Sequence, residues 1–152
     1  MALRVIAHNI RSMFNIGAIF RNADAFGVEH VHLTGYTATP PRPEIQKTAL
    51  GAEEAVPWSH TTDALALIDT LREEGYVIVA CESDPDYSDI RELEPAEKLV
   101  AIFGNEPDGI PPELLERADL RALIPMRGTK SSLNVAVASG VALWELSRQN
   151  NR

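Results

Sequence analysis

The sequence has 152 residues, of which 45% are hydrophobic and 24% are charged, and this composition is typical of an ordinary globular domain. It lacks any apolar run near the ~20 residues that a membrane helix needs, and its N-terminal apolar stretch is too short for a secretory signal. Its formal net charge of −8 argues against a general polyanion-binding protein, and its single cysteine excludes a disulfide framework.

The hydrophobic pattern alternates between short strands and helices along the chain. In chain order, the expected elements are a strand over residues 3–7, a helix over 15–26, a strand over 29–33, a helix from Thr61 or Thr62 to Glu74, strands over 76–81 and 99–103, a short helix over 111–117, a strand over 121–124 and a helix over 133–146. Asn15 can cap the first helix, and the proline-rich segment 34–46 is expected to be a loop. This alternation predicts an α/β fold with a mostly parallel sheet flanked by helices, and ligands beyond the carboxyl ends of the strands.

The last expected helix is unusually apolar. Ten of the 14 residues in the range 133–146 are apolar, and they surround the helix instead of forming one stripe. Such a helix is expected to be buried on more than one side. A subunit interface is one explanation, and complete burial within a single chain is the other.

The charged residues are unevenly distributed. Residues 1–23 hold three arginines and no acid, and residues 120–144 hold three cations and no acid. Of the 22 carboxylates, 18 lie in residues 53–119. Two basic segments in an acidic chain can form one focused positive site, but chance clustering explains them equally well.

Two segments carry candidate functional residues: the first expected helix, with Arg21, and the segment 103–109. Arg21 has no acid at the preceding helical neighbours Gly17 and Ala18, so it is free to recruit phosphate, although a solvated surface arginine is the commoner case. The segment 103–109 directly follows an aliphatic strand. A glycine at this place, Gly104, lets backbone approach a ligand, but the segment alone resembles an ordinary turn.

A third segment, 124–134, is a polar and cationic loop that joins a strand to the apolar last helix. Backbone amides at such a helix start can hold a ligand. It is not a P-loop, because Thr129 separates Gly128 from Lys130, and no dinucleotide Gly-x-Gly-x-x-Gly fingerprint occurs elsewhere. Nucleotide hydrolysis and nicotinamide chemistry therefore lose support.

Other catalytic chemistries also find little support. The four histidines lack the spacing of a metal site, so no metal is expected. No Gly-x-Ser-x-Gly elbow or Cys/His arrangement suggests acyl transfer. Cys81 lies in an apolar run and is interpreted as a strand residue, not a nucleophile. A lone cysteine of this kind fits the reducing cytoplasm.

In their order and spacing, the three segments together resemble the SpoU-type RNA methyltransferases of the SPOUT superfamily. The motifs that carry the resemblance are Asn15-x-Gly17-Ala18-x-x-Arg21, then Phe103-Gly104-Asn105-Glu106-x-x-Gly109, and finally Ile124-Pro125-Met126-x-Gly128-x-x-Ser131-Ser132-Leu133-Asn134. The resemblance covers nearly the whole chain. Pro107 and Pro111 depart from the glycine or serine of many relatives, which puts the shape of that loop in doubt.

The resemblance implies a fold with a C-terminal trefoil knot and a homodimer that uses S-adenosylmethionine to methylate a ribose 2′-hydroxyl of tRNA or rRNA. It also implies one methyltransferase domain over residues 1–152, without an accessory RNA-binding domain, and neither metal nor membrane. Two other functions remain open: a non-catalytic dimeric protein of this fold that binds RNA or nucleotide, and a small-molecule enzyme on a doubly wound sheet.

By matching position, the resemblance assigns three sets of site residues. The catalytic cluster is Arg21, Asn15, Glu106, Ser132 and Asn134; the cofactor contacts are Gly104, Asn105, Ile124, Met126, Leu133 and Cys81; and the candidate RNA contacts are Arg11, Arg127 and Lys130. Relatives are proposed to use the arginine as a base. Because a guanidinium resists deprotonation, we prefer the hypothesis that Arg21 grips phosphate and stabilises developing negative charge.

Overall fold

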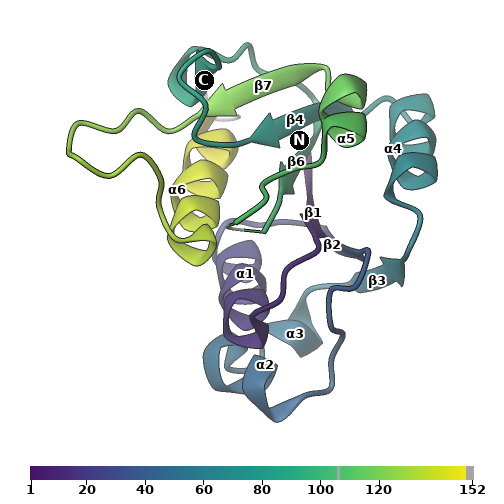
Figure 1. The fold of residues 1–152 in the computed structure, drawn as a ribbon. Coiled ribbons are helices and arrows are strands. Elements are labelled where there is room, and N and C mark those ends of the chain that lie inside the picture. The colour runs from purple at the N-terminus through teal and green to yellow at the C-terminus, as the bar shows by residue number, and fades with distance from the viewer. Residues whose placement is uncertain (106, 150–152) are drawn as a thin grey trace.

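A seven-stranded parallel sheet forms the middle layer of the computed structural model, which describes residues 1–105 and 107–149 (Figure 1). The elements are β1 (Ala2–His8), α1 (Met13–Ala25), β2 (His30–Thr34), α2 (Pro43–Ala49), α3 (Ala52–Ala55), β3 (Trp58–Thr61), α4 (Ala64–Glu73), β4 (Val77–Cys81), β5 (Ser88–Asp89), the 3₁₀ helix η1 (Ile90–Glu92), β6 (Lys98–Phe103), α5 (Pro112–Arg117), β7 (Leu120–Leu123) and α6 (Val135–Arg148). The strand order is β3-β2-β1-β6-β4-β7-β5.

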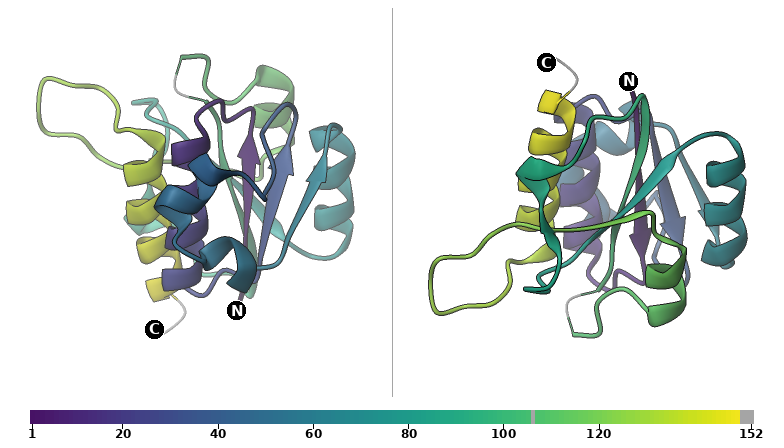
Figure 2. Two further views of the ribbon diagram at one scale, coloured as in Figure 1. Left: turned by 90° about the horizontal axis from the view of Figure 1, so that it is seen from below. Right: turned by 90° about the horizontal axis from the view of Figure 1, so that it is seen from above.

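Helices cover both faces of this sheet (Figure 2). One face packs against α1, α2, α3 and α6, and the other packs against α4 and α5. Alternate residues of β1 serve the two layers, because Val5 lies in the first core cluster and Ile6 in the second. Strands with two buried faces require continuous apolar sequence, which explains the aliphatic runs of β1, β4 and β6.

The predicted α/β class and the parallel sheet are confirmed, but two helix starts are corrected. Ser12, not Asn15, caps α1, because the Ser12 hydroxyl accepts the Asn15 N–H at 3.2 Å. Asp63 caps α4 by accepting the Ala66 N–H at 3.0 Å, so neither Thr61 nor Thr62 has that role. A cap is chosen by local geometry among several suitable polar side chains, and spacing alone does not distinguish them.

The expected loop over residues 34–46 is also partly wrong, since Pro43 begins α2. Proline suits the first turn of a helix, where its missing N–H has no partner to lose. The sequence pattern also failed to predict α3, β3, β5 and η1, which are all four residues or shorter. The trefoil knot and the single domain over residues 1–152 stay predictions.

The last helix, α6, is buried on one side only within this chain. Its inner face packs against the sheet and α1, but Val137, Val141 and Trp144 are 52, 41 and 53% exposed. Complete burial within the monomer is therefore wrong, and the exposed apolar face needs another explanation. Within the described ranges, no helix is long and apolar enough to cross a membrane.

Two histidines lie side by side on β2, under the sheet's second face. The rings of His30 and His32 are 4.3 Å apart, and the Ser59 hydroxyl lies within hydrogen-bond distance of both. His32 is 6% exposed, and its Nε2 atom has no hydrogen-bond partner among the residues described. Burial, together with the neighbouring His30, lowers the pKa of His32 to about 3.

The free energy of unfolding is expected to fall as the pH drops below about 6.5, the ordinary histidine pKa. Between that pH and about 3, His32 is protonated in the unfolded chain but not in the folded one. This one group therefore lowers the free energy of unfolding by up to about 1.4 kcal/mol for each pH unit of acidification. Urea unfolding at a series of pH values checks this expectation. His32→Leu is expected to flatten the slope. Equal slopes for wild type and His32→Leu would contradict the assignment.

Candidate functional site

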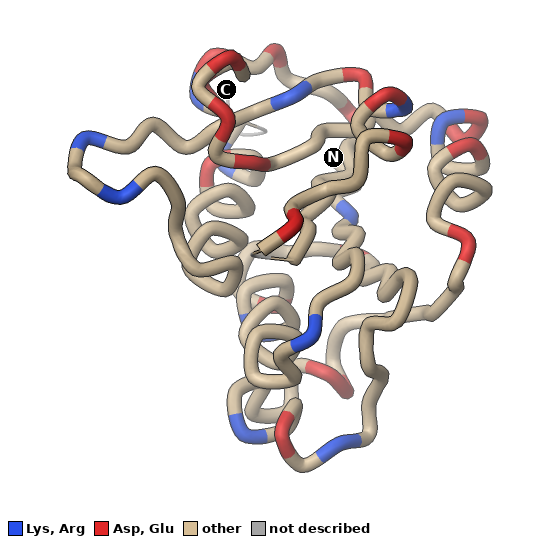
Figure 3. The backbone as a smooth tube through the Cα atoms, in the orientation of Figure 1, with Lys and Arg blue, Asp and Glu red and all other residues tan. Residues whose placement is uncertain are grey.

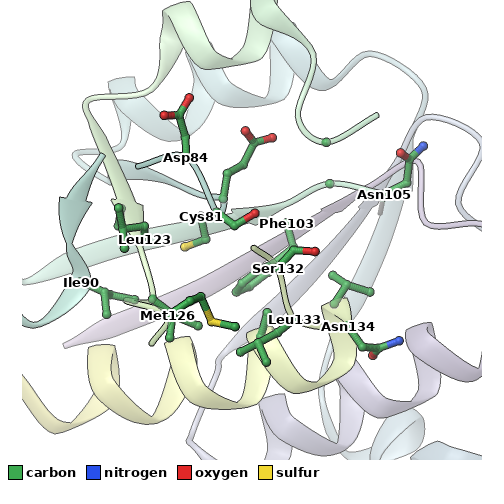
Figure 4. Close-up of a pocket in the computed structure, with 18 of the residues that line it drawn as sticks. Cys81, Asp84, Ile90, Phe103, Asn105, Leu123, Met126, Ser132, Leu133 and Asn134 are labelled. Carbon is green, nitrogen blue, oxygen red and sulfur yellow. The ribbon is translucent and has the colours of Figure 1, made fainter. Parts of the chain in front are cut away.

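A cavity of about 680 Å³ opens beyond the carboxyl ends of β4, β6 and β7 (Figure 4). Its walls are residues 81–85 and Ile90, residues 103–105 and 107–109, residues 122–124 and Met126, and residues 132–135 and Ala138. Four segments that are distant in sequence meet here because parallel strands deliver their carboxyl ends to one edge of the sheet. Its volume is that of a cavity for a small-molecule ligand or cofactor.

The β6–α5 loop is held in place by close backbone packing. Gly104 allows this packing, because a Cβ atom there would lie 2.6 Å from the Gly109 carbonyl group. Asn105 forms an antiparallel bridge to Gly109, and its side-chain oxygen accepts the Asp108 N–H at 2.9 Å. The Glu82 carboxylate accepts the Ile110 N–H and so joins this loop to the end of β4. Two cavity walls are therefore fastened to each other.

The opposite wall is the segment that leads into α6. Asn134 caps this helix, because its side-chain oxygen accepts the Ala136 N–H at 2.8 Å. Among the described residues no acceptor pairs with the Asn134 amide group, which is a donor at the cavity wall. Met126 and Leu133 supply apolar side chains beside it, and the exposed Ser132 lies across from the end of β6 (Figure 4). This wall thus combines an apolar surface with hydroxyl and amide groups.

The charge of the cavity is negative. Among its described lining residues, Glu82, Asp84 and Asp108 are acidic, and none is a lysine or arginine. A cavity of this kind favours a cationic ligand and disfavours a phosphate group. Burial, reinforced by the charge of Glu82, raises the pKa of the Cys81 thiol to about 12, so this cysteine stays protonated and is not an activated nucleophile.

The structure brings together most of the residues expected at the site. All six expected cofactor contacts line the cavity, and so do two expected catalytic residues: Cys81, Gly104, Asn105, Ile124, Met126 and Leu133, with Ser132 and Asn134. Asn15 and Arg21 are not among the lining residues, and Glu106 lies outside the described residues. Asn15 is half-buried in the first turn of α1.

Arg21 lies on the exposed side of α1, which packs against α6. The next residue, Asn22, donates hydrogen bonds to the Ala136 carbonyl at 2.9 Å and the Ser139 hydroxyl at 3.0 Å. These bonds hold the α1 segment that carries Arg21 against the first turns of α6. In the described part of the chain, no carboxylate pairs with Arg21. The backbone at Arg21 is thus held against α6, and its exposed guanidinium is available to an external anion.

The candidate RNA contacts are all exposed. Arg127 and Lys130 lie on the loop between β7 and α6, which projects from the molecule, and Arg11 precedes α1 (Figure 3). One arginine of the first basic segment is not part of such a positive site. Arg4 lies near the amino end of β1, where it is paired with Glu29 at 2.6 Å. The hypothesis of a single focused site is therefore wrong for this arginine.

Sequence reasoning missed the acidic wall of the cavity and one aromatic residue at its rim. Asp84 lines the cavity from the segment between β4 and β5, Ile90 lines it from the start of η1, and Tyr36 follows β2 at the same sheet edge. The available signal was their position directly after expected strands, since parallel strands gather ligands at their carboxyl ends. From the sequence, neither the Asp84 carboxylate nor the Tyr36 ring was assigned to the site.

The fold is a parallel α/β sheet with an acidic cavity outside its strand ends, and these features define a cofactor-binding domain. Because the cavity disfavours phosphate, this domain differs in class from P-loop and dinucleotide-binding proteins. The chain belongs to the SpoU rRNA methylase family, whose model matches residues 2–144. This membership confirms the resemblance seen in the three motifs.

Several named relatives support the assignment. The 23S rRNA (guanosine-2′-O-)-methyltransferase RlmB of Coxiella burnetii is 36% identical over 148 residues, which are 97% of this chain and 59% of RlmB. The tRNA (guanosine(18)-2′-O)-methyltransferase of Aquifex aeolicus is 33% identical over 148 residues, 97% of this chain and 69% of that protein. The chain thus spans little more than half the length of RlmB.

Two solved structures have the same fold. The A. aeolicus TrmH/SpoU tRNA modifying enzyme superimposes with a TM-score of 0.88 and 31% identity, and the match covers 98% of this chain and 75% of that one. The SpoU methyltransferase AviRb from Streptomyces viridochromogenes, in complex with the cofactor AdoMet, has a TM-score of 0.89 and 27% identity over 99% of this chain and 58% of AviRb.

Proposed function

We propose that this chain transfers a methyl group from S-adenosylmethionine to a ribose 2′-hydroxyl of rRNA or tRNA. The observation that carries the proposal is the cavity at the strand ends, whose described lining holds three carboxylates and no cation. S-adenosylmethionine has a positively charged sulfonium centre and no phosphate, so this lining suits it better than a nucleotide. The relatives named for 2′-O-methylation and the AdoMet complex of AviRb support the same choice.

The lining residues fit such a cofactor. Gly104, Ile124 and Leu133 offer backbone groups at the three strand and helix ends, and Met126 adds an apolar wall. The acidic wall formed by Glu82, Asp84 and Asp108 provides acceptors for hydroxyl or ammonium groups. When bound, the cofactor supplies an electrophilic methyl group, so the chain itself needs mainly to position the acceptor oxygen.

The remaining residues act on the RNA. Arg21 holds an RNA phosphate and stabilises the charge that develops on the 2′-oxygen, because its guanidinium remains protonated. The hydroxyl proton that the methyl group replaces passes to water. Ser132 and the amide group of Asn134 orient the ribose, while the side-chain oxygen of Asn134 keeps its capping bond at the start of α6. We assign Glu106 the ordering of Asn134 or of its own loop. The exposed Arg11, Arg127 and Lys130 contact further phosphates.

Isothermal titration calorimetry with S-adenosylmethionine tests the cofactor step, and mapping of 2′-O-methylation in cellular RNA with and without the gene tests the reaction. Absence of binding at high micromolar cofactor would contradict the proposal. Cofactor-independent RNA binding without any lost methylation site would instead favour the second candidate, a non-catalytic RNA-binding protein of this fold. A lost site would also name the substrate as rRNA or tRNA.

For the location of the protein, we propose the reducing cytoplasm, which suits the single cysteine.

Asp84→Lys is expected to weaken S-adenosylmethionine binding at least about tenfold, since it replaces a carboxylate of the lining with a cation (about 1.4 kcal/mol per tenfold). Asp86→Lys is the matched control, because it makes the same charge change at a neighbouring exposed residue that does not line the cavity. Calorimetry on both variants measures the difference. Tighter cofactor binding by Asp84→Lys would show that the cavity prefers an anion.

We further infer a homodimer through the exposed face of α6. Val137, Val141 and Trp144 follow helical spacing, so they form one apolar stripe on the surface of a single chain. Val141→Glu with Trp144→Glu is expected to convert the dimer to monomer in size-exclusion chromatography with light scattering. Leu50→Glu, on an exposed residue after α2, is expected to leave the dimer intact. A monomeric wild type at high micromolar concentration would refute the dimer.

A further inference from the structure

Tyr36 contacts Asn105, a residue of the cavity wall, and is half exposed. It follows β2 at the carboxyl edge of the sheet, and its side chain is 52% exposed. Its backbone N–H donates to the Asn9 side-chain oxygen at 3.0 Å, which ties the turn after β2 to the turn after β1. A large aromatic residue that is exposed and yet fixed at its backbone offers a preformed surface to a ligand.

The Tyr36 hydroxyl is also fixed, from two sides. It accepts a hydrogen bond from Arg11 Nε at 3.1 Å and another from Asn105 Nδ2 at 2.8 Å. With both acceptor positions occupied, the hydroxyl proton points elsewhere, and within the described ranges it has no acceptor. The ring therefore carries one available donor at the edge of the cavity.

Asn105 connects this ring to the cofactor cavity. It is 8% exposed and lines the cavity, and its side chain bridges the Asp108 N–H and the Tyr36 hydroxyl. Tyr36 is thus separated from the cavity wall by a single hydrogen bond. A ligand on the ring therefore lies next to a residue of the cavity wall.

Arg11 places a cation beside the same ring. Its guanidinium carbon is 5.8 Å from the ring centroid, and its side chain is exposed. Its remaining N–H groups form no ion pair in the described part of the chain, although Asp108 lies near enough to interact electrostatically. An exposed aromatic ring beside a cation is the combination that recognises an unpaired nucleotide, because the base stacks on the ring and the phosphate meets the cation.

We propose that Tyr36 is a stacking platform for an unpaired nucleotide of the RNA substrate, with Arg11 contacting its phosphate and the Tyr36 hydroxyl donating a hydrogen bond to it. The proposal rests on the function proposed above, which requires RNA at this edge of the sheet. It names a subsite next to the methylated nucleotide and assigns the substrate a single-stranded or unstacked region there.

The test compares Tyr36→Ala and Tyr36→Phe with wild type in three measurements. Fluorescence anisotropy with a labelled single-stranded RNA of mixed sequence gives RNA affinity without cofactor. Calorimetry gives the affinity for S-adenosylmethionine, and methyl transfer to bulk RNA from cells lacking the gene gives KM and kcat. Tyr87→Ala is the matched control, because Arg121 also lies 5.8 Å from the Tyr87 ring, but the negative charges of Glu82 and Asp84 act on this tyrosine.

Tyr36→Ala is expected to weaken RNA binding and to raise the KM for RNA, each about tenfold, which corresponds to about 1.4 kcal/mol. The kcat and the cofactor affinity are expected to stay nearly unchanged. Tyr36→Phe keeps the ring and is expected to stay within about threefold of wild type. Arg11→Gln is expected to reduce the salt dependence of RNA binding by about one released counterion.

RNA affinity unchanged in Tyr36→Ala would overturn the proposal. An equal loss of RNA and cofactor affinity would also overturn it, since the ring would then only support Asn105 and the cavity wall. A wild type that binds RNA but transfers no methyl group would refute the proposed function separately, while the comparison of RNA affinities remains readable.

Discussion

Replacing Arg21 with alanine is expected to reduce methyl transfer to RNA about a thousandfold while leaving the affinity for S-adenosylmethionine unchanged. The loss reflects removal of a preorganised cation that stabilises transition-state charge, an effect of about 10²–10³ for a single donor elsewhere. Cofactor affinity is preserved because Arg21 lies on the exposed side of α1 and does not line the cavity. Single-turnover methyl transfer and calorimetry on the same preparation measure the two quantities.

A second variant at this position distinguishes two roles for the guanidinium. Arg21→Lys keeps the charge but loses the planar pair of donors, so a bidentate phosphate contact predicts a large loss of activity. Survival of most activity in the lysine variant would argue against that contact. Arg42→Ala, at an exposed arginine before α2, is the control and is expected to retain wild-type rates.

Gly104→Ala is expected to weaken cofactor binding more than about tenfold and to lower the free energy of unfolding by about 1–3 kcal/mol. The added Cβ would lie 2.6 Å from the Gly109 carbonyl carbon and oxygen and 2.7 Å from the Ile110 N atom. Because these neighbours are backbone atoms, the loop itself must move, and it forms one wall of the cavity. Calorimetry and urea unfolding record both effects.

The control for this variant is Gly128→Ala. A Cβ on Gly128 meets nothing within 4 Å, so this change is expected to leave the free energy of unfolding close to wild type. Equal stability of Gly104→Ala and Gly128→Ala would show that the β6–α5 loop moves freely and does not define the cavity. A tight cofactor complex of Gly104→Ala would lead to the same conclusion.

Much of the site was predictable from residue order. The aliphatic runs that became β1, β4 and β6 predicted buried parallel strands, and the strand-end rule placed Gly104 and Cys81 at one edge. The third motif placed Leu133 and Asn134 at the start of the last helix. These features depend on local composition and on position relative to a strand end, which are readable without a fold.

Other features depended on contacts between distant residues. Strand β3 has a short, mostly polar sequence and is a strand because it pairs with β2 at the sheet edge. The Asn15 cap was wrong because Ser12 is the cap that the turn after β1 provides. The motif resemblance grouped Arg21 with the residues of the cofactor motifs. In the fold, the packing of α1 leaves Arg21 outside the cavity of its own chain.

Periodicity in this chain predicts an α/β layer order, and the resemblance of its three motifs to a known family indicates the loops that form the cofactor cavity. They do so because burial on both faces and close backbone approach leave marks on neighbouring residues. The positions of Asp84 and Tyr36 after expected strands were readable from the sequence, but the acidic cavity wall and the contacts of Tyr36 with Arg11 and Asn105 were not. These groups converge because the crossover connections bring separate strand ends to the same edge, and that arrangement exists only once the sheet has assembled.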